Sequence, residues 1–425
     1  MLSPKLLCGM ALMLCLSGCG TLSSNHIDLS ARAMHLAVCG APLWQQVDAL
    51  ALPQLQQTPG ISIAVLDAQG RQQLFNYGYL DSSRKAPVTS DTRFAIGSLS
   101  KGFTAEATAW LVQHQQLNWQ DKLGALLPDP AALSADARNI TLEQLATHSA
   151  GLPRQITNSA MLAKLVDYLF TGAPFYQDLD RGEYRRWLAA FHRPAQPQVV
   201  YSNLGYALLD RAVLLKSGQP PQQWVAQQIL QPLAMRHTGY QPDALPDSAD
   251  RAVGHAGDQP KFMSRGQPVP DWQFHGDMVG AAALWSTSRD LLRYAQAHLQ
   301  GSGDATLDAA FQDAMRVRIT APGHDDAALG WLQNTLFGQQ ILYQSGFIGG
   351  FASYIGLDRR HGTAVVVLQN SFNWRNDIGH RLLLRLAEQQ DHPCTTASVA
   401  LPDAKSESAH LLRRSADRSL VAARD

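Results

Sequence analysis

Residues 94–101 of the 425-residue chain read Phe94-Ala95-Ile96-Gly97-Ser98-Leu99-Ser100-Lys101. The apolar residues that follow recur at helical spacing, so the sequence predicts a helix over residues 98–115 with a serine and a lysine in its first turn. Side chains three positions apart lie on the same face of a helix. Ser98 and Lys101 are therefore expected to be neighbours at a helix N-terminus.

This pair of side chains suits nucleophilic catalysis. A serine hydroxyl is a weak nucleophile until a base removes its proton. A lysine buried beneath the serine loses its charge more easily, because desolvation lowers its pKa from about 10.4. Backbone N–H groups at the helix N-terminus also stabilise a developing anion. The same spacing occurs in ordinary helices that begin with a capping serine, so Ser98 and Lys101 alone do not identify an active site.

Two further segments supply candidate partners. Tyr201 and Asn203 lie where an apolar run turns into a predicted helix over residues 203–217. A phenol near a cation loses its proton more easily, which predicts a lowered pKa for Tyr201. Alternatively, Tyr201 covers the core and Asn203 caps the helix. The segment Gln344-Ser345-Gly346, followed by Phe347, ends a predicted strand and could equally be an ordinary glycine-containing strand end.

The order of predicted elements is strands, then helices, then strands. Short β-rich runs occupy residues 61–66, 73–79, 328–333, 340–344, 351–357 and 363–368. The clearest helices between them cover residues 141–147, 161–170, 203–217 and 288–299. This order predicts an α+β fold in which early and late strands share one antiparallel sheet and a mainly helical second lobe is inserted between them.

Terminal helices over residues 42–58 and 377–390 are expected to flank that sheet. The sequence thus divides residues 42–394 into an α/β lobe, about 42–115 and 325–394, and a helical lobe, about 116–324. A cleft between two such lobes is a natural binding site.

The N-terminus carries a targeting signal. Lys5 precedes an apolar run over residues 6–17 that is too short to span a bilayer as a mature helix. It ends in Leu16-Ser17-Gly18-Cys19, which resembles a bacterial lipoprotein cleavage box. The resemblance implies a signal peptide over 1–18, lipid attachment at Cys19 and a tether over 19–41. The alternative is an ordinary secretory signal that contains a cysteine.

The residue after Cys19 is Gly20 rather than Asp. By resemblance to Gram-negative lipoproteins, this favours an outer-membrane, periplasm-facing location in the bacterial cell envelope. Once the signal is removed and Cys19 is acylated, Cys39 and Cys394 remain. In an oxidising compartment these two could form a disulfide, or they could stay as free thiols. The polar tail over 395–425 is expected to be mobile.

Composition excludes several function classes. Lys plus Arg and Asp plus Glu both number 35, so the formal net charge is zero. A nucleic-acid-binding protein usually carries a basic face, so no nucleic-acid partner is predicted. The sequence contains no CxxC, HxxxH or phosphate-binding loop motif, and it predicts neither a metal site nor a cofactor.

Taken in chain order, these segments resemble the serine hydrolases of the class C β-lactamase and DD-peptidase superfamily. The resemblance covers most of residues 42–390. It is carried by 94–101, 140–153 (ITLEQLATHSAGLP), 201–205 (YSNLG), 281–291 (AAALWSTSRDL) and 345–353. It implies a β-lactamase/transpeptidase-like fold and an enzyme that forms an acyl-enzyme.

The resemblance also implies a role for each site residue. Ser98 would be the nucleophile, and Lys101 and Tyr201 would share its proton. Asn203 would orient Lys101 and bind the substrate chain, and the backbone N–H groups of Ser98 and Phe347 would form an oxyanion hole. Two other residues in the matched segments, His148 and Tyr206, are interpreted as structural.

One position departs from the family pattern. Gln344 stands where the family usually has Lys or His, whereas Ser345 and Gly346 keep the strand edge. A lysine there would attract the carboxylate of a β-lactam or D-Ala terminus, and charged hydrogen bonds are about twice as strong as neutral ones. The expected substrate is therefore first a peptidoglycan-type D-amino-acid peptide or small amide, then an ester, then a β-lactam.

Gln344 also keeps a second interpretation open. A catalytically silent member of the same fold could serve as a ligand- or partner-binding lipoprotein. In either case specificity is expected from the loops over 154–198 and 255–278.

Overall fold

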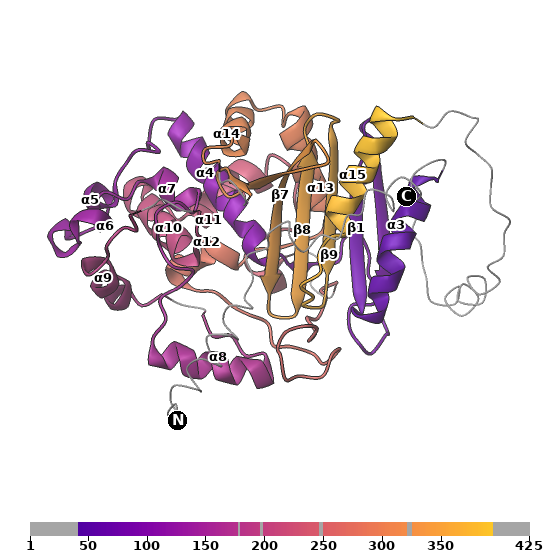
Figure 1. Cartoon of the computed structure of the whole chain (residues 1–425), viewed down its shortest axis with the longest axis horizontal. Helices are drawn as coiled ribbons and strands as arrows, with labels where there is room; N and C mark the ends of the chain where they lie inside the picture. The colour runs from indigo at the N-terminus through magenta and orange to yellow at the C-terminus, as the bar shows by residue number, and fades with distance from the viewer. Residues whose placement is uncertain (1–40, 177–178, 196–198, 246–249, 321–324, 394–425) are drawn as a thin grey trace.

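The first and last long strands of the protein are neighbours in one sheet. The computed structural model describes residues 41–176, 179–195, 199–245, 250–320 and 325–393. Its seven-stranded antiparallel sheet has the order β2-β1-β9-β8-β7-β6-β5 (Figure 1). The strands are β1 (Gly60–Leu66), β2 (Gln72–Gly78), β5 (Asp326–Ala327), β6 (Leu332–Leu336), β7 (Gln339–Ile348), β8 (Phe351–Asp358) and β9 (Thr363–Gln369). The predicted sheet of early and late strands is confirmed.

The central strands are covered on both faces. On β1, Ile61 and Ile63 point into a core formed with the terminal helices α3 (Leu43–Ala51) and α15 (Ile378–Asp391). The alternate residue Ala64 belongs to the larger core on the other face. This alternation follows from the period of two in a strand. The α+β fold with flanking terminal helices is thus confirmed.

The other face of the sheet carries the helices that position the site. α13 (Ser288–Gln300) packs against β1 and β9, and α14 (Ala305–Met315) packs against α4 (Ser100–Gln113). The sheet-side group of elements therefore includes α13, which the sequence division assigned to the helical lobe. The helix α14 has no counterpart among the predicted helices.

Further helices lie in the middle of the chain. They are α5 (Leu123–Leu126), α6 (Ala135–Arg138), α7 (Leu142–Ala146), α8 (Ser159–Thr171), α9 (Arg181–Ala189), α10 (Asn203–Ser217), α11 (Pro221–Val225) and α12 (Val279–Ala282). The bounds of α10 agree with the prediction because its signals are local. Ser202 accepts a hydrogen bond from Gly205 N at its start, and Gly218 ends it in the left-handed conformation.

The strand predicted over 328–333 is wrong in its bounds. Ala328 N donates to Trp331 O (2.9 Å) across a turn in which Gly330 has φ +74°, and β6 begins only at Leu332. A glycine adopts this left-handed backbone without a steric penalty, so the apolar run bends before it pairs.

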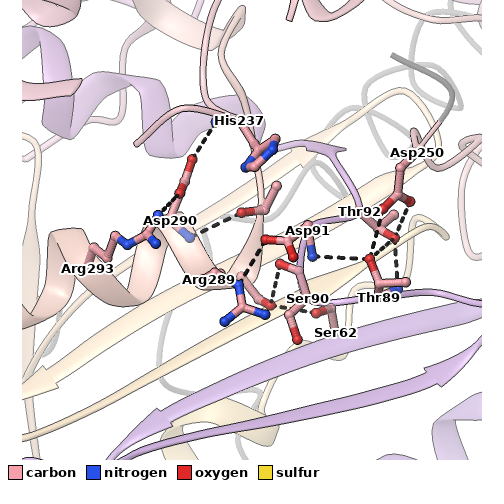
Figure 2. Close-up of polar contacts among 12 residues, drawn as sticks. Ser62, Thr89, Ser90, Asp91, Thr92, His237, Asp250, Arg289, Asp290 and Arg293 are labelled. Atoms are coloured by element: carbon pink, nitrogen blue, oxygen red, sulfur yellow. Dashed lines mark hydrogen bonds and ion pairs between the residues drawn. The ribbon is translucent and has the colours of Figure 1, made fainter. Parts of the chain in front are cut away.

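A polar layer fixes the chain just before the candidate nucleophile. Figure 2 shows Asp250 accepting a hydrogen bond from Thr92 Oγ1 (2.6 Å) and Asp91 accepting one from Arg289 Nε (2.9 Å). The segment then enters β3 (Phe94–Ala95), which pairs with β4 (Trp285–Ser286). The approach to Ser98 is therefore tied to the N-terminus of α13.

Several sequence predictions lie outside the described residues. These are the signal peptide, the lipid site Cys19, the tether up to residue 40, the Cys39–Cys394 pair and the tail over 395–425. Across the described part of the chain, no helix is both long and apolar enough to span a membrane.

The packing of α15 on β8 yields a stability prediction. A Cβ at Gly379 would overlap the ring of the buried Tyr354. We expect Gly379→Ala to lower the free energy of unfolding by about 1–3 kcal/mol, since overpacking a filled core forces side chains and backbone to shift. Urea denaturation monitored by circular dichroism measures this change.

Gly182→Ala in α9 is the matched control. Its Cβ would meet only the ends of the Arg186 and Asp180 side chains, at 3.2 Å. We expect a change of less than about 1 kcal/mol, of the size of the helix-propensity difference. Equal losses in the two variants would contradict the packing argument.

Candidate active site

Ser98 lies in a short 3₁₀ turn over Gly97–Leu99, between β3 and α4. The α-helix begins at Ser100, two residues later than predicted. Ser98 is partly exposed, whereas Gly97 and Leu99 are buried. β7 runs directly beside this turn, since a Cβ at Gly346 would overlap Ile96 O and lie 3.1 Å from Ser98 N. One serine is thus presented to solvent at the edge of the sheet.

Lys101 lies beneath Ser98, one helical turn along the chain. Its Nζ donates hydrogen bonds to Ser98 Oγ (3.2 Å) and to Ala281 O (2.8 Å). The residue is only 1% exposed. Burial lowers the pKa of Lys101 well below its usual value, and the positive charge of Arg154 lowers it further. The predicted direction of this pKa shift is confirmed.

Tyr201 completes a cluster with Ser98 and Lys101. Lys101 Nζ lies 4.9 Å from the centroid of the Tyr201 ring. The Tyr201 hydroxyl is buried and has no partner at standard hydrogen-bond geometry among the described residues. Burial raises the pKa of Tyr201 to about 12, although the charge of Arg154 and the nearby Ser98 hydroxyl oppose this shift. The predicted lowering of this pKa is wrong, because the effect of desolvation outweighs that of the Arg154 charge and of Ser98.

His148 packs against the ring of Tyr201. The two ring centroids are 4.4 Å apart. His148 Nδ1 accepts a hydrogen bond from Ser202 N (3.1 Å), and His148 O accepts one from Val200 N (2.9 Å). Burial, followed by the charges of Lys101 and Arg154, lowers the pKa of His148 to about 3. A neutral His148 therefore connects its own segment to residues 200–202, which directly precede α10.

Asn203 is brought to the same place as the first residue of α10. It is buried, and its backbone N donates to Arg154 O (2.8 Å). In the described part of the chain, the hydrogen bonds of Lys101 go to Ser98 and Ala281, and none joins it to Asn203. The orienting role of Asn203 stays a prediction.

Gln344 faces inward rather than toward solvent. It is 4% exposed, and its amide lies so close to Gly102 that a Cβ there would overlap it. With the amide oriented so that both ends are paired, its nitrogen donates to Leu99 O (3.0 Å) and its oxygen accepts from Trp331 Nε1 (3.2 Å). Gln344 thus links β7 to the start of α4, and its contact with substrate stays a prediction.

The residues after Gln344 form the exposed edge of β7. Ser345 and Phe347 are partly exposed. Ser345 Oγ accepts a hydrogen bond from Asn376 Nδ2 (3.2 Å), and the Phe347 ring packs against Phe372 and Trp374. The Phe347 backbone lies close to the turn that carries Ser98, since its carbonyl carbon is 3.4 Å from a Cβ built at Gly97, and its role in an oxyanion hole stays a prediction.

A buried polar cluster behind the site was not predicted. Glu106 on α4 accepts hydrogen bonds from Tyr294 Oη (2.7 Å) and Trp331 Nε1 (2.9 Å) and lies 2.8 Å from His298 Nε2. The signal that could have indicated it is a glutamate on an otherwise apolar face of the 100–113 helix. Arg154 and the Ala281 carbonyl were also missed. Among the described residues, no group of three or more metal-ligating side chains is found.

A cavity of about 370 Å³ lies near the cluster of Ser98, Lys101 and Tyr201, since Val200, the residue before Tyr201, is part of its lining. It is lined by residues 151–153 and by Trp187, Ala190, Phe191, His192 and Val200. The loop over 154–198, which is one of the two predicted to control specificity, contributes Trp187, Ala190, Phe191 and His192 to this lining. The other lining residues lie just before or after that loop. Its lining does not include Ser98, Lys101 or Tyr201.

The family model described as Beta-lactamase matches residues 47–389, which is most of the chain. This chain belongs to the beta-lactamase family. Members of this family are serine hydrolases, and the matched region contains every candidate residue from Ser98 to Phe347.

Curated relatives within the family have different named activities. The chain is 27% identical to the D-alanyl-D-alanine-carboxypeptidase/endopeptidase AmpH of Escherichia coli, over 73% of this chain and 80% of that protein. It is 27% identical to a beta-lactamase of Pseudomonas fluorescens, over 77% and 93%. It is also 27% identical to the unguisins hydrolase ungD' of Aspergillus campestris, over 78% of this chain but only 62% of that protein.

Solved structures share the fold. A class C beta-lactamase superposes with a TM-score of 0.67 at 20% identity, covering 85% of this chain and 97% of that one. The D-alanine carboxypeptidase AmpC of Burkholderia cenocepacia superposes with a TM-score of 0.64 at 22% identity, covering 80% and 98%. The predicted β-lactamase/transpeptidase-like fold is confirmed.

The contact between Gly102 and Gln344 predicts non-additive stability effects. Gly102→Ala should displace the Gln344 amide, whereas Gln344→Ala should empty the space that the new methyl group needs. We expect the double variant to be more stable than the sum of the single losses indicates, by about 1–2 kcal/mol. Urea denaturation of the four proteins measures this coupling, and strictly additive losses would rule the contact out.

The charge of Arg154 predicts a pH effect on Ser98 reactivity. Only the neutral amine of Lys101 can accept the Ser98 proton, so the rate of Ser98 labelling by a fluorophosphonate should rise with pH and level off below the usual lysine pKa of about 10.4. Arg154→Gln removes a cation that disfavours the ammonium form. Its loss should raise the pKa of Lys101 and move the rising limb to higher pH.

Rate constants for labelling measured over about pH 6–11 give the midpoint of that limb. Ser98→Ala supplies the unlabelled control. A limb that stays in place or moves to lower pH in Arg154→Gln would show that the guanidinium does not act on Lys101.

Proposed function

We propose that this protein is a serine hydrolase that forms an acyl-enzyme on Ser98. The observation that carries the proposal is the distance of 3.2 Å between Lys101 Nζ and the oxygen of a partly exposed Ser98. The amine is desolvated and therefore suited to exist as a neutral base at moderate pH. The buried Tyr201 hydroxyl lies in the same cluster.

The proposed reaction follows from these positions. Lys101 accepts the proton of Ser98 as Oγ bonds to the carbonyl carbon of the substrate. The N–H groups of Ser98 and Phe347 stabilise the oxyanion, and one such donor typically contributes about 3 kcal/mol in the transition state. Tyr201, whose pKa of about 12 keeps it protonated near neutral pH, relays the proton to the leaving group. Water then cleaves the acyl ester and Ser98 regains its proton.

We infer that the substrate is a small acyl compound or peptide. The named activities of the relatives support peptides with D-alanine ends and β-lactams as candidates. The inward-facing and neutral Gln344 supplies no charge for a substrate carboxylate. The proposed order is therefore a peptidoglycan-type D-amino-acid peptide or small amide, then an ester, then a β-lactam.

We also propose that the protein is held at the bacterial cell envelope, facing the periplasm, by a lipid on Cys19. The support is the apolar run over residues 6–17 that ends in Leu16-Ser17-Gly18-Cys19. Gly20 after the cysteine supports the outer membrane as its location.

A mass-spectrometric adduct screen tests the proposed activity. The purified protein is incubated with a p-nitrophenyl ester, a penicillin, a cephalosporin and a D-Ala-D-Ala peptide. We expect an acyl adduct on Ser98 with at least the ester, and none in Ser98→Ala. If no reagent, including a fluorophosphonate, modifies Ser98, the protein is a binding member of the fold and the proposal fails.

A further inference from the structure

The guanidinium group of Arg154 lies beside the cluster formed by Ser98, Lys101 and Tyr201. Arg154 is partly exposed, and its Cζ lies 5.1 Å from the centroid of the Tyr201 ring. Lys101 Nζ lies at a similar distance, 4.9 Å, from the same centroid. Within the described ranges, no side chain or backbone group forms a hydrogen bond or ion pair with this guanidinium. Arg154 therefore lies next to Tyr201 with solvent access and with no described residue hydrogen-bonded or ion-paired to its guanidinium.

The main chain of Arg154 is fixed to the elements that carry the site. Arg154 O accepts hydrogen bonds from the N–H groups of Asn203 (2.8 Å) and Leu204 (3.2 Å), which are the first of α10. The preceding carbonyl, Pro153 O, accepts one from Ser202 Oγ (2.6 Å). These bonds satisfy N–H groups that a helix start leaves free. The position of Arg154 relative to Tyr201 and Asn203 is thus set by the helix and not by a free loop.

In the part of the chain that the structure describes, no carboxylate forms an ion pair with Arg154. The charge of Arg154 lowers the pKa values of Lys101 and His148 and opposes the rise in the pKa of Tyr201. No carboxylate among the described residues contributes to these three pKa shifts. His148 is neutral near neutral pH. Arg154 therefore brings a positive charge to Tyr201, whereas Gln344 on β7 is neutral and buried. An anionic group of a ligand that enters beside Tyr201 would meet the guanidinium of Arg154, which has no hydrogen-bond or ion-pair partner among the described residues.

We propose that Arg154 binds a carboxylate on the acyl part of the substrate and makes the site selective for acidic acyl groups. This inference rests on the proposed hydrolase function. We assign the carboxylate to the acyl part of the substrate because the backbone of Arg154 is hydrogen-bonded to that of Asn203. Asn203 is the residue proposed to bind the substrate chain. A guanidinium pairs with a carboxylate through two parallel hydrogen bonds, which lysine cannot reproduce and glutamine can only replace with neutral ones.

Two esters with the same leaving group test the proposal. One is the 4-nitrophenyl monoester of glutaric acid, which carries a free carboxylate, and the other is its methyl ester, which is neutral. The quantity measured is the ratio of kcat/KM for the anionic ester to that for the neutral ester. A change in the reactivity of Ser98 or Lys101 acts on both esters and cancels in this ratio.

We expect the wild-type protein to prefer the anionic ester and Arg154→Gln to lower the ratio by about tenfold or more, the loss typical of one charged hydrogen-bonded contact. Arg154→Lys should keep part of the preference. Arg186→Gln, which removes an exposed arginine of α9, is the control for net charge and should leave the ratio unchanged.

The outcomes separate this inference from the proposed function. If the wild-type protein hydrolyses both esters and Arg154→Gln leaves the ratio within about twofold, Arg154 is not the carboxylate site. If Arg186→Gln lowers the ratio as much as Arg154→Gln does, the effect is one of overall charge and the proposal fails. If the wild-type protein hydrolyses neither ester, the inference fails, and the hydrolase function fails with it only if a fluorophosphonate also leaves Ser98 unmodified.

Discussion

The structure of the site depends on holding the Lys101 amine in a desolvated position below Ser98. Lys101 Nζ has one fixed acceptor besides the serine, the carbonyl of Ala281. Two hydrogen bonds fix the backbone of the neighbouring Gly280. Its oxygen accepts one from Thr104 Oγ1 and its nitrogen donates one to Asp210 Oδ2, each at 2.8 Å. Burying an ionisable amine opposes folding, so α4 and α12 must be packed tightly enough to compensate.

The parts of the fold that follow from local signals could be predicted from the sequence. The limits of α10 are set by Ser202 and Gly218, which lie at its two ends. The pairing of Ser98 with Lys101 follows from helical spacing alone, even though Ser98 itself lies in a 3₁₀ turn. The short β-rich runs identified the strands of the sheet, because strands buried on both faces, such as β1, β8 and β9, are apolar along most of their length.

The remaining features depend on contacts between distant segments. The raised pKa of Tyr201 results from burial, which no local pattern contains. Glu106 and His298 lie 192 positions apart, and their pairing requires α4 and α13 to be placed first. Arg154 looked like a loop residue, because only the tertiary structure brings its guanidinium over the Tyr201 ring. The inward direction of Gln344 likewise depends on the space that Gly102 leaves.

The pairing of β1 with β9 delays completion of the sheet during synthesis. Gly60 N donates to Asn370 Oδ1 (2.7 Å) across 310 positions, so the β1–β2 hairpin leaves the ribosome long before its partner. At about 5–20 residues per second, the interval is roughly 15–60 s. Throughout it, the inner edge of β1 is unpaired and exposes groups on which other chains could aggregate. A chaperone that covers this hairpin would therefore raise the yield of folded protein.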